Sequence, residues 1–347
     1  MGELTIVAPE SKPASGGVAD YTLRLIEYLP SPDQISIVAP PFDWKTRALD
    51  SAKVLLQYSA YGFDRFGYPR DLIRTLINWK QRTGGLLVVM FHEIWTFWPV
   101  TNKNYFVQLL HRRALKRLLR YTDVVFTSTA GQVEHLRALD SGTPIHLLPV
   151  GTNIRRSPGA PSNREPGTAV LFGLQSSRIS TLQRMATGLR QLASSGRIGK
   201  LITAGASSGS SHDSIESKLL DELRLTNAFE QRGALPEEAI SRLLLSASFG
   251  IFGQSELSYT KSGTFMAYAA HELNIIAEPA SKNEPACWVI APAELIAGIS
   301  ETELRIRAEK LRHWQQQTSS WETIAAKLAD ALGLGSRNSA TIAGASR

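Results

Sequence analysis

The clearest strand–helix–strand unit of the chain is the stretch SASFGIFGQSELSYTKSGTFMAYAAHELNIIA, residues 246–277. Its pattern predicts an apolar strand at Phe249–Phe252, a polar loop, a helix that begins near Ser262, and a further strand at Asn274–Ala277. Serine is typical of a helix N-cap. A strand, a helix and a second strand in this order form the repeating unit of a parallel β-sheet with helices on its faces.

The same alternation of short apolar runs and helical patterns extends over most of the chain. Helical periodicity is clear at Val18–Leu29 and Arg70–Lys80. We therefore expect an α/β protein with two doubly wound, Rossmann-like domains. The predicted strands of the first domain are Thr5–Ala8, Ile35–Ala39, Val54–Tyr58, Leu86–Phe91, Val124–Thr127 and His146–Pro149. Those of the second are Ala169–Phe172, Leu201–Ala204, Phe229–Arg232, Phe249–Phe252, Asn274–Ala277 and Trp288–Ile290.

The segment Arg155–Gly167, which reads RRSPGAPSNREPG, interrupts this alternation. Its Pro, Gly, Ser and charged residues are typical of a linker. We therefore expect a first domain over residues 1–154 and a second over residues 168–318. Residues 335–347 are rich in Gly, Ser and Ala, and we expect them to be disordered.

The composition excludes several classes of protein. The single cysteine, Cys287, rules out a disulfide framework and a multi-cysteine metal site. The 38 Lys and Arg residues exceed the 31 Asp and Glu residues, and the net charge of +7 suits phosphate-bearing ligands or an anionic membrane surface equally. We see no signal peptide, transmembrane run or nucleic-acid-binding motif. A cytoplasmic protein without a nucleic-acid partner is therefore expected.

Ligands of doubly wound sheets bind at the carboxyl ends of the strands, beside helix N-termini, so we expect both sheets to face a central cleft. The strongest candidate site follows the strand Phe249–Phe252. There, Lys261 and the backbone N–H groups of Ser262, Gly263 and Thr264 suit an anion of the size of a diphosphate. An ordinary capped helix with one solvated lysine would show the same pattern.

In each domain, a glycine turn follows the first predicted strand. Gly16 and Gly17 let a backbone approach a ligand closely, but the G-x-G-x-x-G pattern of nicotinamide dinucleotide sites is absent, and a plain turn explains them equally. In the second domain, Gly173 follows the strand and Arg178 lies close by. Arg178 can face phosphates, or it can lie on the surface.

His92 and Glu93 follow the fourth predicted strand, where they can orient a sugar hydroxyl or move a proton. A zinc site of the H-E-x-x-H type is excluded because Thr96 stands where the second His would be. A satisfied polar pair under nearby tryptophans is the alternative. Asn153, after the last strand of the first domain, can contact a ligand or cap the linker turn.

The order and spacing of these motifs resemble the nucleotide-sugar-dependent glycosyltransferases of the GT-B fold. The similarity is greatest to their retaining branch, which includes glycogen synthase, sucrose synthase and bacterial mannosyl- and glucosyltransferases. The resemblance extends from Thr5 to about Leu334. It is carried by SGGVADY (15–21), VLLQYSAYGFDRFGYP (54–69), LLVVMFHEIW (86–95), TDVVFTSTAGQVEHL (122–136), LLPVGTNI (147–154), RGALPEEAISRLLLSASFGIF (232–252) and SSWETIAAKLADAL (319–332).

The resemblance implies that the second domain binds the donor, that the first binds the acceptor, and that a C-terminal helix at 319–334 crosses back to the first domain. It further implies transfer to a hydroxyl group, with retention and without a metal or other cofactor. The implied catalytic residues are His92, Glu256, Lys261 and Arg178. The implied donor and phosphate contacts are Gly16, Gly17, Gly173, Ser262, Gly263 and Thr264, and the acceptor-side candidates are Asp20, Glu93 and Asn153.

The chain departs from the family at one important position. The family pattern is a Glu, seven residues and a second Glu, which holds the donor ribose; here Glu256 takes the first place and Thr264 the second. Either the donor site has altered ribose contacts, or the chain is a non-catalytic nucleotide-binding or partner protein. Glu272-Leu273-Asn274 also replaces the usual Gly-x-Pro. A sugar-nucleotide epimerase is a third possibility, and a dehydrogenase ranks last.

Residues 104–121, NYFVQLLHRRALKRLLRY, interleave leucines with five basic residues. A basic amphipathic helix of this kind can lie on anionic lipid at the inner face of a membrane, or it can pack on the core with its basic face in water. Membrane contact would suit a lipid-linked acceptor or a precursor of surface polysaccharide, which is an argument by analogy.

Overall fold

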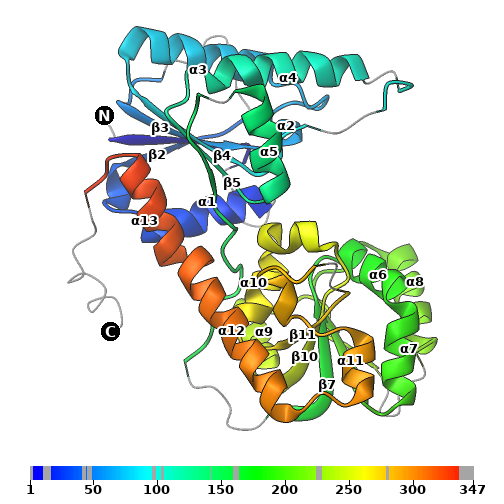
Figure 1. Ribbon diagram of the computed structural model, residues 1–347. Helices are drawn as coiled ribbons and strands as arrows, with labels where there is room; N and C mark the ends of the chain where they lie inside the picture. Colours follow the sequence, from blue (N-terminus) through cyan, green and yellow to red (C-terminus); the bar gives the residue numbers. More distant parts are fainter. Residues whose placement is uncertain are drawn as a thin grey trace. The chain divides into compact units, whose positions relative to one another are not determined.

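In the computed structural model, the described residues are 3–10, 17–40, 44, 49–95, 99–102, 105–140, 142–158, 164–223, 229–278 and 281–335. They divide into a first unit, Met1–Pro149 with Trp321–Arg347, and a second unit, Val150–Ser320 (Figure 1). Each unit is described by itself, and the predicted cleft between them stays a prediction.

The first unit contains a parallel six-stranded sheet in the order β2-β1-β3-β4-β5-β6. Its strands are almost continuously apolar, as in β4, LLVVMF, because helices cover both faces of the sheet. The strands are β1 (Leu4–Val7), β2 (Ile35–Val38), β3 (Lys53–Tyr58), β4 (Leu86–Phe91), β5 (Val124–Thr127) and β6 (Ile145–Leu147).

Helices α3 and α4 cover one face of this sheet, and α1 with α13 covers the other (Figure 1). The ring of Trp321 at the start of α13 lies 5.0 Å from that of Tyr21 in α1, so the C-terminal helix packs within the first unit. The helices are α1 (Gly17–Tyr28), η1 (Pro32–Gln34), α2 (Ala60–Phe63), α3 (Arg70–Thr83), α4 (Tyr105–Leu119), α5 (Ala130–Leu139) and α13 (Trp321–Ala331), where η denotes a 3₁₀-helix.

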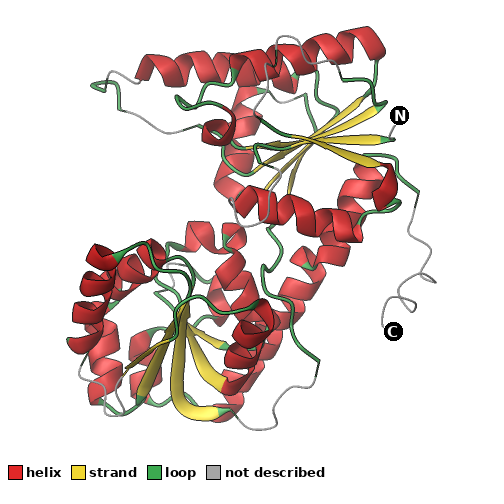
Figure 2. Cartoon of the chain, turned by 180° about the vertical axis from the view of Figure 1, so that it is seen from behind, coloured by secondary structure: helices red, strands yellow, loops and turns green. Residues whose placement is uncertain are grey.

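The second unit contains a parallel five-stranded sheet in the order β11-β10-β7-β8-β9. As in the first unit, helices flank both faces (Figure 2). The strands are β7 (Glu165–Phe172), β8 (Lys200–Ala204), β9 (Phe229–Gln231), β10 (Ala247–Ile251) and β11 (Asn274–Ile276). The helices are α6 (Gln175–Arg184), α7 (Ala186–Ser194), α8 (Ser210–Asp221), α9 (Glu237–Ser246), η2 (Glu256–Lys261), α10 (Gly263–Ala270), η3 (Ala286–Trp288), α11 (Pro292–Ala297) and α12 (Glu301–Ser319).

The structure differs from the sequence-based expectation at the last predicted strand and in the linker. Trp288–Ile290 is not a strand: η3 covers Ala286–Trp288, and Ile290 forms only an isolated bridge with Ile276. The linker is shorter than expected, because β7 already begins at Glu165.

The described part of the expected linker is anchored on the second unit. The guanidinium of Arg156 donates to the carbonyl oxygen of Ala270, and that of Arg164 donates to the carbonyl oxygens of Ala247 and His271. The boundary therefore falls after Pro149 and not after residue 154. Most of the tail that we expected to be disordered, from residue 336 on, lies outside the described residues.

Within the described part of the chain, none of the helices combines the length and the apolar character that a membrane span requires.

Candidate functional site

A row of glycines follows the strands of the second sheet. Gly173, Gly205, Gly233 and Gly253 each lie within two residues of the end of β7, β8, β9 or β10. Because all these strands are parallel, the four glycines lie at one edge of the sheet. Ligands of doubly wound sheets bind at this edge, so it is the candidate site of the second unit.

The glycines are required for different reasons. A Cβ atom on Gly205 would lie 2.0 Å from the carbonyl oxygen of Gly173, and one on Gly253 would lie 2.8 Å from Cα of Thr181, so both are required by close packing. Gly173 has φ +139°, and among the described residues beyond its chain neighbours only Oγ1 of Thr264, at 3.4 Å, lies near its Cβ position. The space in front of Gly173 therefore opens toward the first turn of α10.

The first turn of α10 carries groups that favour an anion. Ser262 is the N-cap, and its side chain accepts a hydrogen bond from the backbone N–H of Phe265 at 3.2 Å. No acidic residue lies in the first turn. The helix dipole and the N–H groups of Gly263 and Thr264 favour negative charge there, and Lys261 precedes them at the end of η2. The structure thus places Gly173 beside Thr264, which directly follows Lys261, Ser262 and Gly263; that these residues bind an anion stays a prediction.

An aromatic cluster holds this turn in place. The rings of Tyr259 and Phe265 stack at 4.5 Å between centroids, and the ring of Phe252 stands nearly perpendicular to both. All three side chains are buried. They join the end of β10, η2 and the start of α10 in one apolar contact, so the loop cannot shift without exposing aromatic surface.

Tyr268 connects α10 to the end of β7. Its hydroxyl accepts a hydrogen bond from the backbone N–H of Phe172 at 2.9 Å and donates to the carbonyl oxygen of Val170 at 3.2 Å. The ring packs against Gly250, where a Cβ atom would lie 2.8 Å from it. Burial raises the pKa of the Tyr268 hydroxyl, so it stays protonated and can donate. This contact sets the distance between Gly173 and Thr264.

Arg178 does not face a phosphate, which corrects the prediction. Its side chain is buried (4% exposed) and forms a bidentate ion pair with Glu216, at 2.7 and 2.8 Å. Its Nη1 donates to the carbonyl oxygen of Gly173 at 2.7 Å. The guanidinium therefore supports the loop after β7 from inside. This ion pair could not be predicted from local sequence, because Glu216 lies 38 positions further along the chain.

Asn153 belongs to the second unit and not to the first, where an acceptor-side role was expected. Its side-chain amide lies 3.4 Å from the position that a Cβ atom on Gly263 would occupy. The segment is held there because the N–H of Val150 donates to the carbonyl oxygen of Thr260 at 2.9 Å. Asn153 is exposed beside the first turn of α10, so it becomes a candidate for the anion site.

Glu256 is the first residue of η2, and its carboxylate accepts a hydrogen bond from the hydroxyl of Ser281. Ser281 was not predicted as a site residue, because it lies 25 positions further along the chain. The hydroxyl orients the Glu256 carboxylate, which is half-buried.

The first unit places His92 directly after β4, where it is buried (7% exposed). Its Nε2 lies 2.7 Å from Oε1 of Gln57, and the ring of Tyr21 stands edge-on to it at 4.8 Å. An amide oxygen only accepts, so Nε2 of His92 carries a hydrogen in this arrangement. Gln57 could have been found in the sequence, because it is the only polar residue inside the buried part of β3.

Buried polar atoms gather near this histidine. Nε2 of Gln57, the hydroxyl of Tyr21 and Oγ of Ser128 have no hydrogen-bond partner among the described residues. Ser128 follows β5, which pairs with β4, so it lies beside His92 in register. Buried polar groups are usually satisfied. These atoms can therefore pair with a polar ligand or with ordered water.

The other described site residues predicted in the first unit are exposed to solvent. The Glu93 carboxylate is exposed and accepts a hydrogen bond from the hydroxyl of Ser59 at 3.0 Å. Asp20 is exposed on α1, and Gly17 begins that helix, with nothing from the described part of the chain within 4 Å of its Cβ position. Gly16 lies outside the described residues. Among the described residues, no group of three His, Cys, Asp or Glu is placed to hold a metal ion.

Comparison with solved structures shows which proteins have this fold. A structure of WaaG, a glycosyltransferase involved in lipopolysaccharide biosynthesis, matches with a TM-score of 0.61 at 14% identity, over 96% of this chain and 100% of that one. HepE from Anabaena, in a complex with UDP and glucose, matches with a TM-score of 0.59 at 14% identity, over 96% and 100%.

Sucrose-phosphate synthase from Thermosynechococcus elongatus matches with a TM-score of 0.58 at 13% identity, over 95% of this chain and 98% of that one. No protein-family model matches the chain, and no curated protein is similar to it in sequence. The similar structures are GT-B glycosyltransferases, so the predicted GT-B fold is confirmed.

Proposed function

We propose that the chain transfers a sugar from a nucleoside-diphosphate sugar to a hydroxyl acceptor. The observation that carries the proposal is the junction of Gly173 with the first turn of α10, where an unobstructed glycine faces the helix N-terminus that Lys261 precedes. The fold supports it, because similar structures contain UDP, and in one case UDP with glucose.

The diphosphate of the donor is assigned to the second unit. The N–H groups of Gly263 and Thr264 and the ammonium of Lys261 would stabilise the charge that develops on the leaving phosphate. Asn153, whose side chain lies beside the same turn, would add a polar contact there. Arg178 contributes as a positioning residue, because it holds the carbonyl group of Gly173.

The donor sugar and the acceptor are assigned to polar side chains that lie near strand ends in each unit. Glu256 would accept hydrogen bonds from hydroxyl groups of the donor sugar, with its carboxylate oriented by Ser281. In the first unit, His92 would bind the sugar, and Glu93 and Asp20 would bind the acceptor. The buried, unpartnered atoms of Gln57 and Ser128 support a ligand rich in hydroxyl groups there.

We further propose that a hexose is transferred with retention and without a metal or other cofactor. The bond from the anomeric carbon to the phosphate oxygen breaks, and a bond to the acceptor oxygen forms. The acceptor proton passes to the departing phosphate on the same face of the sugar, so no separate base is needed. This part of the proposal rests on the resemblance in sequence. For the acceptor, we propose a lipid-linked or surface-polysaccharide precursor at the inner face of a membrane.

The first test measures donor binding. We expect one nucleoside diphosphate to raise the melting temperature of the protein, since a ligand that binds only the folded state must stabilise it. Lys261→Ala should weaken that binding about 10- to 100-fold, as expected for a hydrogen bond to a charged group. The matched control is Lys218→Ala, because Lys218 is exposed on α8 of the same unit.

The second test measures turnover with the sugar nucleotide that binds. Release of the nucleoside diphosphate that depends on an added acceptor supports sugar transfer. Binding without turnover over a broad acceptor panel would instead favour a non-catalytic nucleotide-binding protein, which the replacement of the second family Glu by Thr264 makes the main alternative. An isomerised sugar nucleotide formed without acceptor would favour an epimerase. No binding by any nucleoside diphosphate would refute the donor site.

A further inference from the structure

Helix α4 of the first unit has an unusual outer face. Its inner face is buried through five residues at helical spacing: Gln108, His111, Leu115, Leu118 and Leu119. On the opposite side, Phe106 is 73% exposed and Leu110 is 50% exposed. Val100, just before the helix, is 74% exposed. An outer face is normally polar, so these apolar side chains need an explanation.

The exposed residues form one stripe along α4. At about 100° per residue, Phe106, Leu109, Leu110, Arg113, Lys116 and Arg117 fall within an arc of about 120°. The first half of the stripe is apolar and the second half is basic. Arg112 is outside this group, because its guanidinium lies over the ring of Trp95, 5.4 Å from the centroid.

The charge on this stripe is not balanced along the helix. Residues 94–122 contain no Asp or Glu, so no acidic side chain one turn away can pair with Arg113, Lys116 or Arg117. By contrast, the exposed Arg305 on α12 pairs with Glu309 one turn away. The stripe thus combines exposed apolar groups with uncompensated positive charge.

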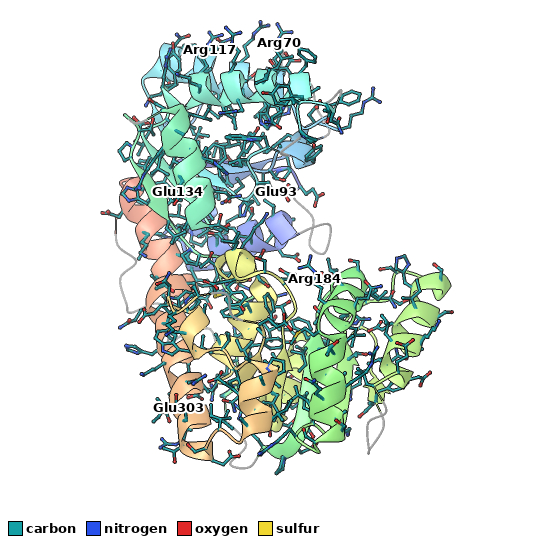
Figure 3. The ribbon with its side chains drawn as sticks, turned by 45° about the vertical axis from the view of Figure 1, so that its right-hand side comes forward. Arg70, Glu93, Arg117, Glu134, Arg184 and Glu303 are labelled. Atoms are coloured by element: carbon teal, nitrogen blue, oxygen red, sulfur yellow. The ribbon has the colours of Figure 1, made fainter. Side chains whose placement is uncertain are left out.

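The neighbouring helix extends the positive surface. α3 packs beside α4, and its Arg70 and Arg74 are exposed. Figure 3 shows Arg70 and Arg117 on the same outer side of the first unit. The basic area therefore spans two adjacent helices and is too wide for a single ion pair.

We infer that the outer stripe of α4 binds the surface of an anionic lipid bilayer. Phe106, Leu109 and Leu110 would enter the boundary between head groups and acyl chains, while Arg113, Lys116 and Arg117 remain among the anionic head groups. Charge complementarity selects this partner, because an apolar protein surface would leave the cations unpaired. The inference does not depend on sugar transfer.

The test is co-sedimentation of the full chain with vesicles. The protein should sediment with equimolar phosphatidylcholine and phosphatidylglycerol, should not sediment with phosphatidylcholine alone, and should be released by salt, because ions screen surface charge. The triple variant Arg113→Gln, Lys116→Gln, Arg117→Gln should bind roughly 100-fold more weakly. Phe106→Ser should also weaken binding; as an exposed side chain, it is not needed for folding.

The matched control removes the same charge from the second unit, through Lys218→Gln, Arg305→Gln and Lys310→Gln, all at exposed positions. It should bind vesicles like the parent protein. Equal loss in both triple variants would show that net charge alone acts, which overturns the assignment to α4. Three other results would also overturn the assignment to α4: equal binding to neutral vesicles, no binding to any vesicle, or a dimer in solution that Phe106→Ser dissociates.

Discussion

Nη1 of Arg178 donates a hydrogen bond to the carbonyl oxygen of Gly173, at 2.7 Å, from the interior of the second unit. The loop after β7 is therefore positioned by a buried ion pair, because Glu216 holds the other side of the same guanidinium. Arg178 was predicted to bind phosphate, but it instead supports the backbone at Gly173, which would face the phosphate.

Replacing Arg178 should reveal this supporting role. Arg178→Met leaves the buried Glu216 carboxylate without its partner, so we expect the free energy of unfolding to fall by about 3–5 kcal/mol. The double variant Arg178→Met, Glu216→Met should recover most of this loss, because the unpaired charge is gone. Urea denaturation of the three proteins checks this. A double variant as unstable as the single one would contradict the explanation.

Gly173 should be sensitive to the addition of a single methyl group. Gly173→Ala forces a side chain into φ +139° and places Cβ beside Oγ1 of Thr264. We expect a loss of stability of about 1 kcal/mol, with a larger effect on affinity for the nucleoside diphosphate. Gly196→Ala is the control, because Gly196 has φ +70° with open space around its Cβ position. It should lose stability only.

Tyr268→Phe removes one hydroxyl from the contact between α10 and β7. The buried N–H of Phe172 then has no acceptor, so unfolding should require about 1–3 kcal/mol less free energy. The affinity for the nucleoside diphosphate should fall as well, because the end of β7, directly before Gly173, is no longer tied to α10. Calorimetric titration and urea denaturation of the same variant separate the two effects. Tyr105→Phe, in the first unit, should leave nucleotide affinity unchanged.

The stability of the chain should depend on two buried histidines. Burial lowers the pKa of His271 to about 4, with Arg156 and Arg164 nearby acting in the same direction. Burial likewise lowers the pKa of His111 to about 4. Both folded-state values lie below the ordinary value of about 6.5, so the unfolded chain binds more protons in between. The stability that depends on these two neutral histidines is fully present above about pH 6.5, and it is lost as the pH falls toward about 4.

Urea denaturation at about pH 7.5 and about pH 5 tests this expectation. The parent protein should be less stable at the lower pH. His271→Gln should show a smaller difference between the two conditions, because one of the two titrating groups is gone. His212→Gln should keep the full difference, because His212 is exposed on α8. An unchanged difference in His271→Gln would contradict the assignment.

The fold could be predicted from the sequence because its signals are local. A short apolar run such as LLVVMF in β4 is typical of a strand that is buried on both faces. The site was less predictable, since several of its side chains are held by residues that are distant in sequence. Arg178 is paired with Glu216, and His92 contacts Gln57, 35 positions away. Asn153 was placed in the wrong unit because its loop follows the last strand of one sheet but packs against η2 of the other unit.

Thr264 offers the sharpest test of how the donor is held. The Thr264 side chain is half-buried, and its Oγ1 lies 3.4 Å from the position that a Cβ atom on Gly173 would occupy. Thr264→Glu restores the acidic pattern of the resembling family and adds negative charge at a helix N-terminus, which should stabilise α10 by about 0.3–1 kcal/mol. The new carboxylate can bind two ribose hydroxyls, but it also repels phosphate. We therefore expect tighter binding of the nucleoside and weaker binding of inorganic diphosphate, measured by calorimetric titration with each ligand separately.

Thr264→Gln is the control, because it has the same length without the charge and should not weaken diphosphate binding. If Thr264→Glu left both affinities unchanged, the first turn of α10 would not be the donor site.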